Sequence, residues 1–271
     1  LTNEKFTLEF TSNPAWYGIQ ALPYLMEFPH ECAEQVFSRY YANAIATFIA
    51  NTNPKIKEVF ESWKNITPEA FLSNLDKNPE LKSVILEETP WLLNANNEQE
   101  RKRQVGVLFD LVRMSRELNS ALDKLIQKQV SSGAWTWFEG MPEDRYITQH
   151  IVTGLGHLEH LKVRYVREND KSWAMTKNAV AYLDREMQKD YDELKKLEKR
   201  GIIKMADQHI GYFQIQYLYA RSFFKDLAIE RNHQEAFNYF KGQAQTYWLN
   251  FNRYSQGMMG LALHRFEDKA T

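Results

Sequence analysis

The sequence predicts an all-α protein. Apolar residues recur every three or four positions over long segments, the spacing that places them on one face of a helix. The 271 residues include only 11 glycines and 8 prolines, which argues against a turn-rich all-β fold. One segment, residues 4–10, alternates Phe6, Leu8 and Phe10 with polar neighbours, and this predicts a single short, half-buried strand.

Helices are predicted in order along the chain, with boundaries set by proline, glycine and capping residues. Pro14 suits a first helical position, and Gly133 and Gly201 end two of the longer helices. Residues 135–141 are strongly aromatic but are predicted as a loop. The result is a succession of roughly ten helices or more. The predicted helices cover residues 14–26, 31–51, 98–130, 146–161, 170–199, 207–228, 232–250 and 254–266, with further short helices beginning near residues 54, 68 and 79.

Composition limits the kinds of partner. A formal net charge of -1 offers no electrostatic attraction for nucleic acid or for an anionic membrane surface. No apolar run in the sequence reaches the length of a membrane span. A single cysteine excludes an internal disulfide framework. The class that remains is a globular helical protein.

The only cysteine begins a short motif with chemical meaning. Cys32 is followed by Glu34 and Gln35 in the pattern Cys-x-Glu-Gln. Residues i and i+3 share a face of a helix, so the Cys32 sulfur can attack the side-chain amide carbon of Gln35 and expel ammonia. The product is an internal thioester, an activated acyl group that a later nucleophile can take over. The alternative is a free cysteine that packs as a small hydrophobic residue near a helix start.

Three stretches of the chain resemble one known family. The first is the run from Ser12 to Leu25, Ser-Asn-Pro-Ala-Trp-Tyr-Gly-Ile-Gln-Ala-Leu-Pro-Tyr-Leu, followed by Cys32-Ala33-Glu34-Gln35. The second is Gly-Ala-Trp-Thr-Trp-Phe-Glu-Gly at 133–140 with Arg-Tyr-Ile-Thr at 145–148, and the third is Gly-Met-Met-Gly-Leu-Ala-Leu at 257–263. Together they resemble the thioester-containing domain of bacterial alpha-2-macroglobulins, which are related to the thioester-containing complement components.

The resemblance implies a fold and a context. It implies an α/α toroid, in which helical hairpins form an inner and an outer ring, over residues 13–271. Residues 1–12 are then expected to be the residual strand and linker of a preceding β domain. Because the chain begins with Leu1 and ends just after a helix, we expect a piece of a longer protein, truncated at the C-terminus as well. The family also implies a periplasmic or cell-surface location.

A thioester persists only when apolar groups shield it from water. Phe28, four residues before Cys32, occupies the position where bacterial relatives commonly carry a shielding tyrosine. Trp135, Trp137 and Phe138 are further candidate shields, and their alternative role is ordinary core packing or an interface with another domain.

Complement-like relatives carry a histidine that attacks the thioester first and directs its transfer to hydroxyl groups. The matching region, residues 139–143, contains no histidine. Direct attack by amines is therefore expected, with His150 as the fallback candidate for the missing histidine.

The remaining titratable residues point to no other chemistry. His150, His157 and His160 lie on one predicted helix, but a packed or solvated histidine face is favoured over a metal site. The acidic residues of the helix 170–199 are expected to form a solvated face; they are Asp184, Glu186, Asp190, Asp192 and Glu193. No metal and no cofactor are expected.

The expected function is that of the thioester domain of a protease trap, a single-use acyl donor and not a turnover enzyme. Its partners would be proteases, captured covalently through lysine amines, and neighbouring β domains of the same chain. One alternative is an α/α-toroid carbohydrate-active enzyme, with Trp135 and Trp137 stacking on sugars and Glu139, Glu143 or Asp144 as acid or base. Another alternative is an inert helical scaffold.

Overall fold

The structure is a computed structural model that describes residues 31–52, 111–163 and 165–266. This part of the chain is dominated by helices and contains no β-strand, which confirms the all-α character. The expected strand at 4–10, the helices beginning near residues 14, 54, 68 and 79, and Phe28 lie outside the described residues. The α-helices are α2 (Ala33–Thr52), α7 (Leu111–Lys128), α8 (Arg145–His160), α9 (Tyr165–Glu168), α10 (Asp170–Lys199), α11 (Tyr212–Arg221), α12 (Gln234–Tyr247) and α13 (Arg253–Arg265).

The chain divides into two compact units. One consists of Leu1–Pro29 and Ser38–Ala121, and the other of His30–Phe37 and Leu122–Thr271. In the first unit, α2 buries Tyr40 and α7 buries Leu118. The second unit holds α8 to α13 together with the start of α2 and the end of α7. The Cys-x-Glu-Gln motif and the aromatic segment at 133–141 therefore belong to the same unit.

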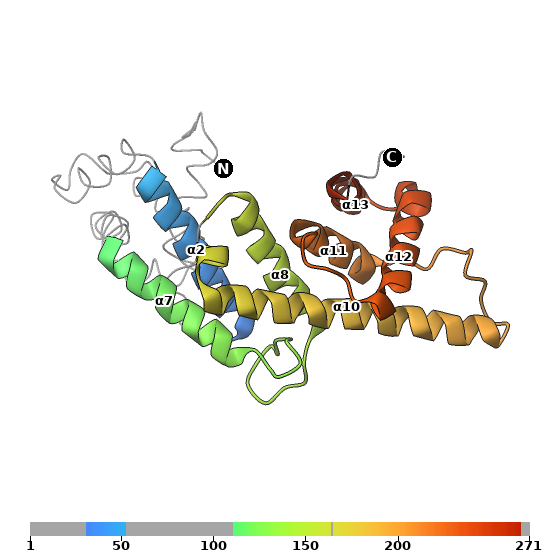
Figure 1. Cartoon of the computed structure of the whole chain (residues 1–271), viewed down its shortest axis with the longest axis horizontal. Helices are drawn as coiled ribbons and strands as arrows, with labels where there is room; N and C mark the ends of the chain where they lie inside the picture. Colours follow the sequence, from blue (N-terminus) through green and yellow to red (C-terminus); the bar gives the residue numbers. More distant parts are fainter. Residues whose placement is uncertain (1–30, 53–110, 164, 267–271) are drawn as a thin grey trace, which may run out of the picture. The chain divides into compact units, whose positions relative to one another are not determined.

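The core of the second unit is built around α8 and α10. Helix α8 contacts both α10 and α11, and α11 contacts α13 (Figure 1). Ile147, Ile151 and Leu155 of α8 are fully buried at intervals of four residues. Ala179 and Leu183 of α10 are buried at the same interval. This spacing is the helical periodicity on which the sequence-based prediction of both helices rests.

Side-chain caps set where these helices begin. Asp144, Asn169 and Asn252 precede α8, α10 and α13, and each side chain accepts a hydrogen bond from the backbone N–H three residues later. Helix α10 ends before Gly201, whose φ of +70° is the left-handed conformation that glycine adopts without strain. The observed range of α10, Asp170–Lys199, is the predicted one.

Helix α11 is shorter than predicted. The prediction covered residues 207–228, whereas α11 spans Tyr212–Arg221 and continues only as a 3-10 turn at Ser222–Phe224. The side chain of Gln243 on α12 accepts a hydrogen bond from the backbone N–H of His209 at 2.8 Å and donates one to the carbonyl of Asp207 at 3.0 Å. These long-range bonds satisfy backbone groups that a helix would otherwise pair locally, so residues 207–210 remain irregular.

The next predicted helix also differs at its ends. The helix predicted over 232–250 is observed as α12, Gln234–Tyr247, with 3-10 turns at Arg231–His233 and Trp248–Asn250 on either side. Short 3-10 turns of this kind are common at the ends of α-helices.

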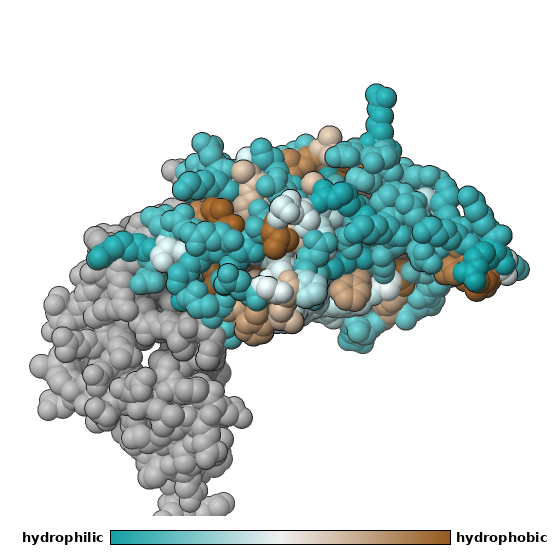
Figure 2. All heavy atoms as spheres, turned by 90° about the horizontal axis from the view of Figure 1, so that it is seen from below, coloured by the Kyte–Doolittle hydropathy of each residue, from teal (hydrophilic) through white to brown (hydrophobic). Residues whose placement is uncertain are grey.

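The surface seen in Figure 2 is mostly hydrophilic, with apolar side chains scattered among polar ones. Scattered apolar groups are ordinary on a protein surface and define no single contact area. Within the described ranges, no helix combines the length and the apolar character needed to cross a membrane.

Candidate functional site

Cys32 lies directly before the first residue of α2. Its carbonyl oxygen accepts a hydrogen bond from the backbone N–H of Val36 at 3.0 Å, as expected of a residue at the N-cap position. Only 5% of Cys32 is exposed. Glu34 lies in the first turn, where its negative charge is favoured by the positive end of the helix dipole.

Gln35 follows in the first turn of the same helix. Its side-chain oxygen Oε1 is buried and has no hydrogen-bond partner in the described part of the chain. The burial of Cys32 and of this oxygen keeps water away from the two groups that a thioester would join. Cys32 is the N-cap residue and Gln35 lies in the first turn, so both belong to the start of α2.

Trp135 anchors the aromatic segment that follows α7. Its backbone forms isolated β-bridges with Gln129 and with Asp144, and its N–H donates a hydrogen bond to Thr148 Oγ1 at 3.0 Å. The indole Nε1 donates to the carbonyl of Leu125 at 2.9 Å, and the residue is fully buried. Of the two interpretations considered for Trp135, core packing agrees with this environment.

Gly133 makes the turn into this segment. Its φ is +92°, and a Cβ atom built on it would lie 2.3 Å from the carbonyl oxygen of Asn178. No other residue type fits this position without moving the backbone of α10. The glycine therefore allows the chain to pass directly against α10 on its way to Trp135.

Trp137 connects the aromatic segment to the motif. Its carbonyl oxygen accepts a hydrogen bond from the N–H of Ala33 at 3.1 Å, which satisfies one of the backbone donors left free at the start of α2. The Trp137 ring stacks on Tyr146, with 6.3 Å between ring centroids. Phe138, the next residue, is 57% exposed. Two of the stretches that carry the family resemblance thus meet through a backbone hydrogen bond.

His150 lies beside the first turns of α2. Its ring packs edge-on against Phe37, with 5.7 Å between ring centroids. Burial lowers the pKa of His150 below its usual value of 6.5, and the negative charge of Glu34 partly opposes this shift. The imidazole is therefore neutral at pH 7, so one ring nitrogen can accept a proton.

A cavity of about 510 Å³ lies between the end of α7 and residues 136–141. Glu31, the residue before Cys32, forms part of its wall and makes an ion pair of 2.6 Å with Lys124 of α7. Trp137 and Phe138 line the cavity as well. Sequence reasoning did not find Glu31 and Lys124, because 93 positions separate them and neither belongs to a recognisable pattern.

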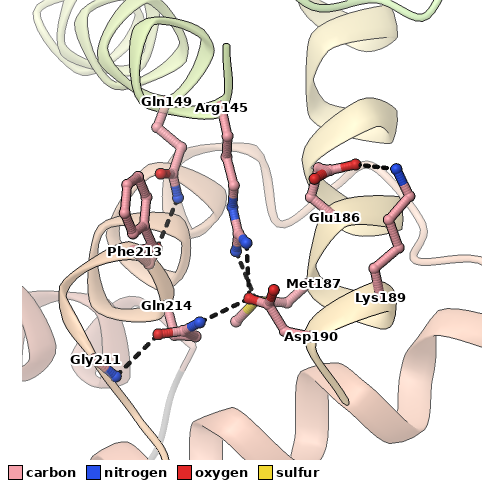
Figure 3. Close-up of polar contacts among 9 residues, drawn as sticks. All are labelled: Arg145, Gln149, Glu186, Met187, Lys189, Asp190, Gly211, Phe213 and Gln214. Carbon is pink, nitrogen blue, oxygen red and sulfur yellow. Dashed lines mark hydrogen bonds and ion pairs between the residues drawn. The ribbon is translucent and has the colours of Figure 1, made fainter. Parts of the chain in front are cut away.

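A polar network holds the start of α8 in place (Figure 3). Arg145 Nη1 and Gln214 Nε2 both donate hydrogen bonds of 2.7 Å to Asp190 Oδ2. Gln149 Nε2 donates to the carbonyl of Phe213 at 2.7 Å. These contacts join α8 to α10 and α11, and they position the end of the loop that leads from Trp137.

The prediction of a solvated acidic face on α10 is wrong for Asp184. Asp184 is only 4% exposed, and its Oδ1 accepts hydrogen bonds from the Tyr217 hydroxyl at 2.6 Å and from Arg221 Nε at 3.1 Å. Burial raises the pKa of Asp184, while Arg221 and Tyr217 oppose the rise.

The prediction is also wrong for Asp190, which is only partly exposed and accepts the hydrogen bonds from Arg145 and Gln214. Asp192 and Glu193 are exposed, as predicted.

His157 and His160 pack against the Phe223 ring, and His157 Nε2 lies 3.1 Å from the Tyr219 hydroxyl. In the ranges that the structure describes, no group of three or more His, Cys, Asp or Glu side chains is arranged to hold a metal ion.

Three comparisons with known proteins were made. A scan against models of protein families, a search of curated protein sequences and a search of solved structures each found no match.

Proposed function

We propose that this chain is the thioester domain of an alpha-2-macroglobulin-like protease trap. In this proposal Cys32 and Gln35 form an internal thioester that captures amine groups of an attacking protease in a single use. Its fold is an α/α toroid, of which the described helices are a part, and its natural partners are neighbouring β domains of a longer periplasmic or cell-surface protein. The proposal rests on the motif and on the family resemblance of three stretches.

One structural observation supports the proposal most directly. Cys32 and the Gln35 side-chain oxygen are both buried at the start of α2, and the backbone of Trp137 is hydrogen-bonded to Ala33 between them. A thioester needs such protection, because water hydrolyses an exposed one. Phe138 is exposed and Trp135 is part of the core, so Trp137 is the best placed of the three aromatic candidates to act as a shield.

The chemistry proceeds in two steps. In the first, the Cys32 sulfur adds to the Gln35 amide carbon, the carbon–nitrogen bond breaks, and ammonia leaves. In the second, an unprotonated amine attacks the same carbon, the carbon–sulfur bond breaks, and the amine proton passes to the Cys32 sulfur. His150 is a candidate to assist, because its ring packs against Phe37 near the start of α2 and its imidazole is neutral at pH 7.

The carbohydrate-active alternative receives less support. Trp135 is fully buried and offers no ring face to a sugar. Asp144 caps α8, and Glu143 Oε2 accepts a hydrogen bond from Ser132 Oγ at 2.5 Å. Two of the three acidic candidates therefore have structural partners, which leaves Glu139 as the third of the candidates for acid or base.

The proposal is tested by the intact mass of freshly purified protein, before and after methylamine treatment. A live thioester makes the protein lighter by one ammonia; methylamine then adds its full mass and frees one thiol. The Cys32→Ala variant is the control, with neither the mass deficit nor the thiol. An unmodified mass together with a thiol that is free from the start would reject the proposal for this chain and favour the inert scaffold.

A further inference from the structure

A second cavity lies between α10 and residues 227–233. Its volume is about 190 Å³, so it takes a smaller ligand than typical binding pockets of about 300–1,000 Å³ do. One wall is formed by four residues of α10 that share a face of the helix because of their spacing; they are Lys177, Val180, Ala181 and Asp184. This cavity has no residue in common with the cavity at the end of α7, and it contains no part of the Cys-x-Glu-Gln motif.

Asp184 brings an unused acceptor to this cavity. Its Oδ1 accepts the hydrogen bonds from Tyr217 and Arg221, whereas no hydrogen bond to Oδ2 comes from the described part of the chain. Arg221 contacts the carboxylate through Nε, while its Nη1 and Nη2 atoms donate to the carbonyl oxygens of Phe224 and Leu227. The Oδ2 atom is thus a carboxylate oxygen in the wall of a cavity, where it favours a positively charged donor.

The opposite wall carries two more polar residues, Glu230 and His233. His233 is only 8% exposed, and its Nε2 lies 3.3 Å from Asn232 Nδ2. Its Nδ1 is buried with no hydrogen-bond partner among the described residues and lies 4.0 Å from Glu230 Oε2, beyond hydrogen-bond distance. Buried polar groups are rarely left unpaired, so this nitrogen in the wall of a cavity favours a site for a polar ligand over ordinary packing.

Lys177 lies at the other end of the α10 wall. It precedes Asp184 by seven residues, which is roughly 10 Å along the helix axis. Lys177 is exposed, and in the described part of the chain it makes no ion pair or hydrogen bond. Between the two charges the wall is aliphatic, and its members are Val180, Ala181, Leu227 and Ala228. The cavity therefore offers acceptors at one end, a cation at the other and apolar surface between them.

We propose that this cavity binds a small aliphatic zwitterion, a molecule in which a short hydrocarbon chain joins an ammonium and a carboxylate group. The ammonium group lies between Asp184 Oδ2 and Glu230, and the carboxylate lies on Lys177. A movement of the exposed Glu230 carboxylate by about 1 Å brings it within hydrogen-bond distance of His233 Nδ1 and gives that nitrogen a partner. A simple cation or anion would leave one end of the cavity unused. This binding site goes beyond the proposed protease trap and does not rest on the thioester.

The first test compares three ligands of equal chain length on the full chain by isothermal titration calorimetry. δ-Aminovalerate carries both charges, n-pentylamine lacks the carboxylate, and valerate lacks the ammonium group. δ-Aminovalerate should bind at least about tenfold more tightly than either analogue, the effect expected when a hydrogen bond to a charged group is lost. Equal affinities of the three, or no binding of δ-aminovalerate at millimolar concentration, would overturn the proposal.

The second test changes two exposed side chains of the wall. Lys177→Met should weaken the binding of δ-aminovalerate by about two- to fivefold, the effect of losing an exposed ion pair, and should leave n-pentylamine unaffected. Glu230→Gln should weaken the binding of both. Lys171→Met and Glu193→Gln make the same changes at exposed positions of α10 outside the cavity, so they are matched controls and should alter no affinity. Wild-type affinity for δ-aminovalerate in both Lys177→Met and Glu230→Gln would contradict the assignment.

Methyl NMR locates the bound ligand. The methyl signals of Val180 and Leu227 should shift when δ-aminovalerate is added, and shifts confined to other methyl groups would place the ligand elsewhere and overturn the proposal. Cys32→Ala should bind δ-aminovalerate with the affinity of the wild type, because Cys32 does not line this cavity. Loss of binding in Cys32→Ala would also reject the proposal, whereas the absence of a thioester would not affect it. The two proposals can thus fail separately.

Discussion

Two half-buried histidines on α8 illustrate how single residues make the stability of the protein depend on pH. Burial is the main cause that lowers the pKa of both His150 and His157. Arg265 on α13 and His160 on α8 lower the pKa of His157 further, and the Tyr219 hydroxyl lies 3.1 Å from its Nε2. The folded protein therefore resists protonation of these rings.

We expect the protein to lose stability as the pH falls through the usual histidine pKa of 6.5. Below that value the unfolded chain binds protons that the folded chain does not, so protonation favours unfolding. His157→Gln should reduce the loss, because glutamine keeps a polar group near Tyr219 and does not titrate. The measurement is the difference in Tm between one pH unit above and one below 6.5.

His264→Gln is the control for this experiment, since His264 lies exposed on α13. Equal pH dependence of Tm in the wild type and in His157→Gln would contradict the prediction.

The buried ion pair of Asp184 and Arg221 gives a second prediction at this scale. Arg221→Met leaves the Asp184 carboxylate buried without its cation and should lower the free energy of unfolding by about 3–5 kcal/mol. This loss in the free energy of unfolding should become smaller as the pH falls. Burial raises the pKa of Asp184, and the protonated, neutral carboxyl group needs no cation beside it. Urea unfolding at several pH values measures both effects.

The double variant Asp184→Asn with Arg221→Met separates charge from packing. It removes the uncompensated carboxylate and should be more stable than Arg221→Met alone at neutral pH. A double variant that is no more stable would indicate that the loss comes from the packing of Arg221 and not from its charge.

At the scale of elements, glycines on α8 allow neighbouring segments to approach it closely. A Cβ atom at Gly154 would lie 2.3 Å from Phe37 Cζ at the start of α2, and one at Gly156 would lie 2.5 Å from Phe223 Cγ. Both contacts are far shorter than ordinary van der Waals distances. The absence of a side chain at these positions thus brings the motif-bearing turn of α2 against α8.

Gly154→Ala should therefore lower the free energy of unfolding by about 1–3 kcal/mol, since the added methyl group forces Phe37 out of place. Gly260→Ala is the matched control, because Gly260 lies in α13 with open space around the position of a Cβ atom. There the same substitution should raise stability by about 0.5–1 kcal/mol through helix propensity alone. Chemical denaturation of both variants checks the pair, and equal effects at the two glycines would argue against the close approach.

At the scale of the whole molecule, the candidate site joins parts of the chain that are far apart in sequence. Residues 30–37 belong to one compact unit with residues 122–271. The Ala33–Trp137 hydrogen bond, the Glu31–Lys124 ion pair and the Phe37–His150 contact all connect these two stretches. The protection of Cys32 is thus a property of the folded unit.

This arrangement predicts that any thioester is lost when the unit unfolds. In a urea titration, the appearance of the Cys32 thiol should follow the loss of helical circular dichroism, because water reaches the Gln35 carbonyl only when the unit opens. The folded unit is what keeps water from the thioester. The control is the Cys32→Ala variant, which should unfold without thiol release. Thiol release at urea concentrations well below the unfolding transition would show that the start of α2 opens on its own.

Local information determined most of what the sequence predicted correctly. The periodicity of apolar residues gave the all-α character and the range of α10, since helix formation depends on neighbours three and four positions away. Gly201 marked the end of α10, because a glycine just after a helix adopts the left-handed conformation that ends it. These features required no knowledge of distant contacts. Gly133 did not mark a helix end, since α7 ends earlier, at Lys128.

Tertiary structure decided the rest, because burial and pairing depend on residues far along the chain. Asp184 is followed by basic and acidic neighbours typical of a surface helix, yet Arg221 and Tyr217 enclose it. Trp135 and Trp137 have the same local pattern, but one fills the core and the other meets Ala33. No local pattern distinguishes these outcomes, since the free energy of burying each side chain depends on partners that only the folded chain brings together.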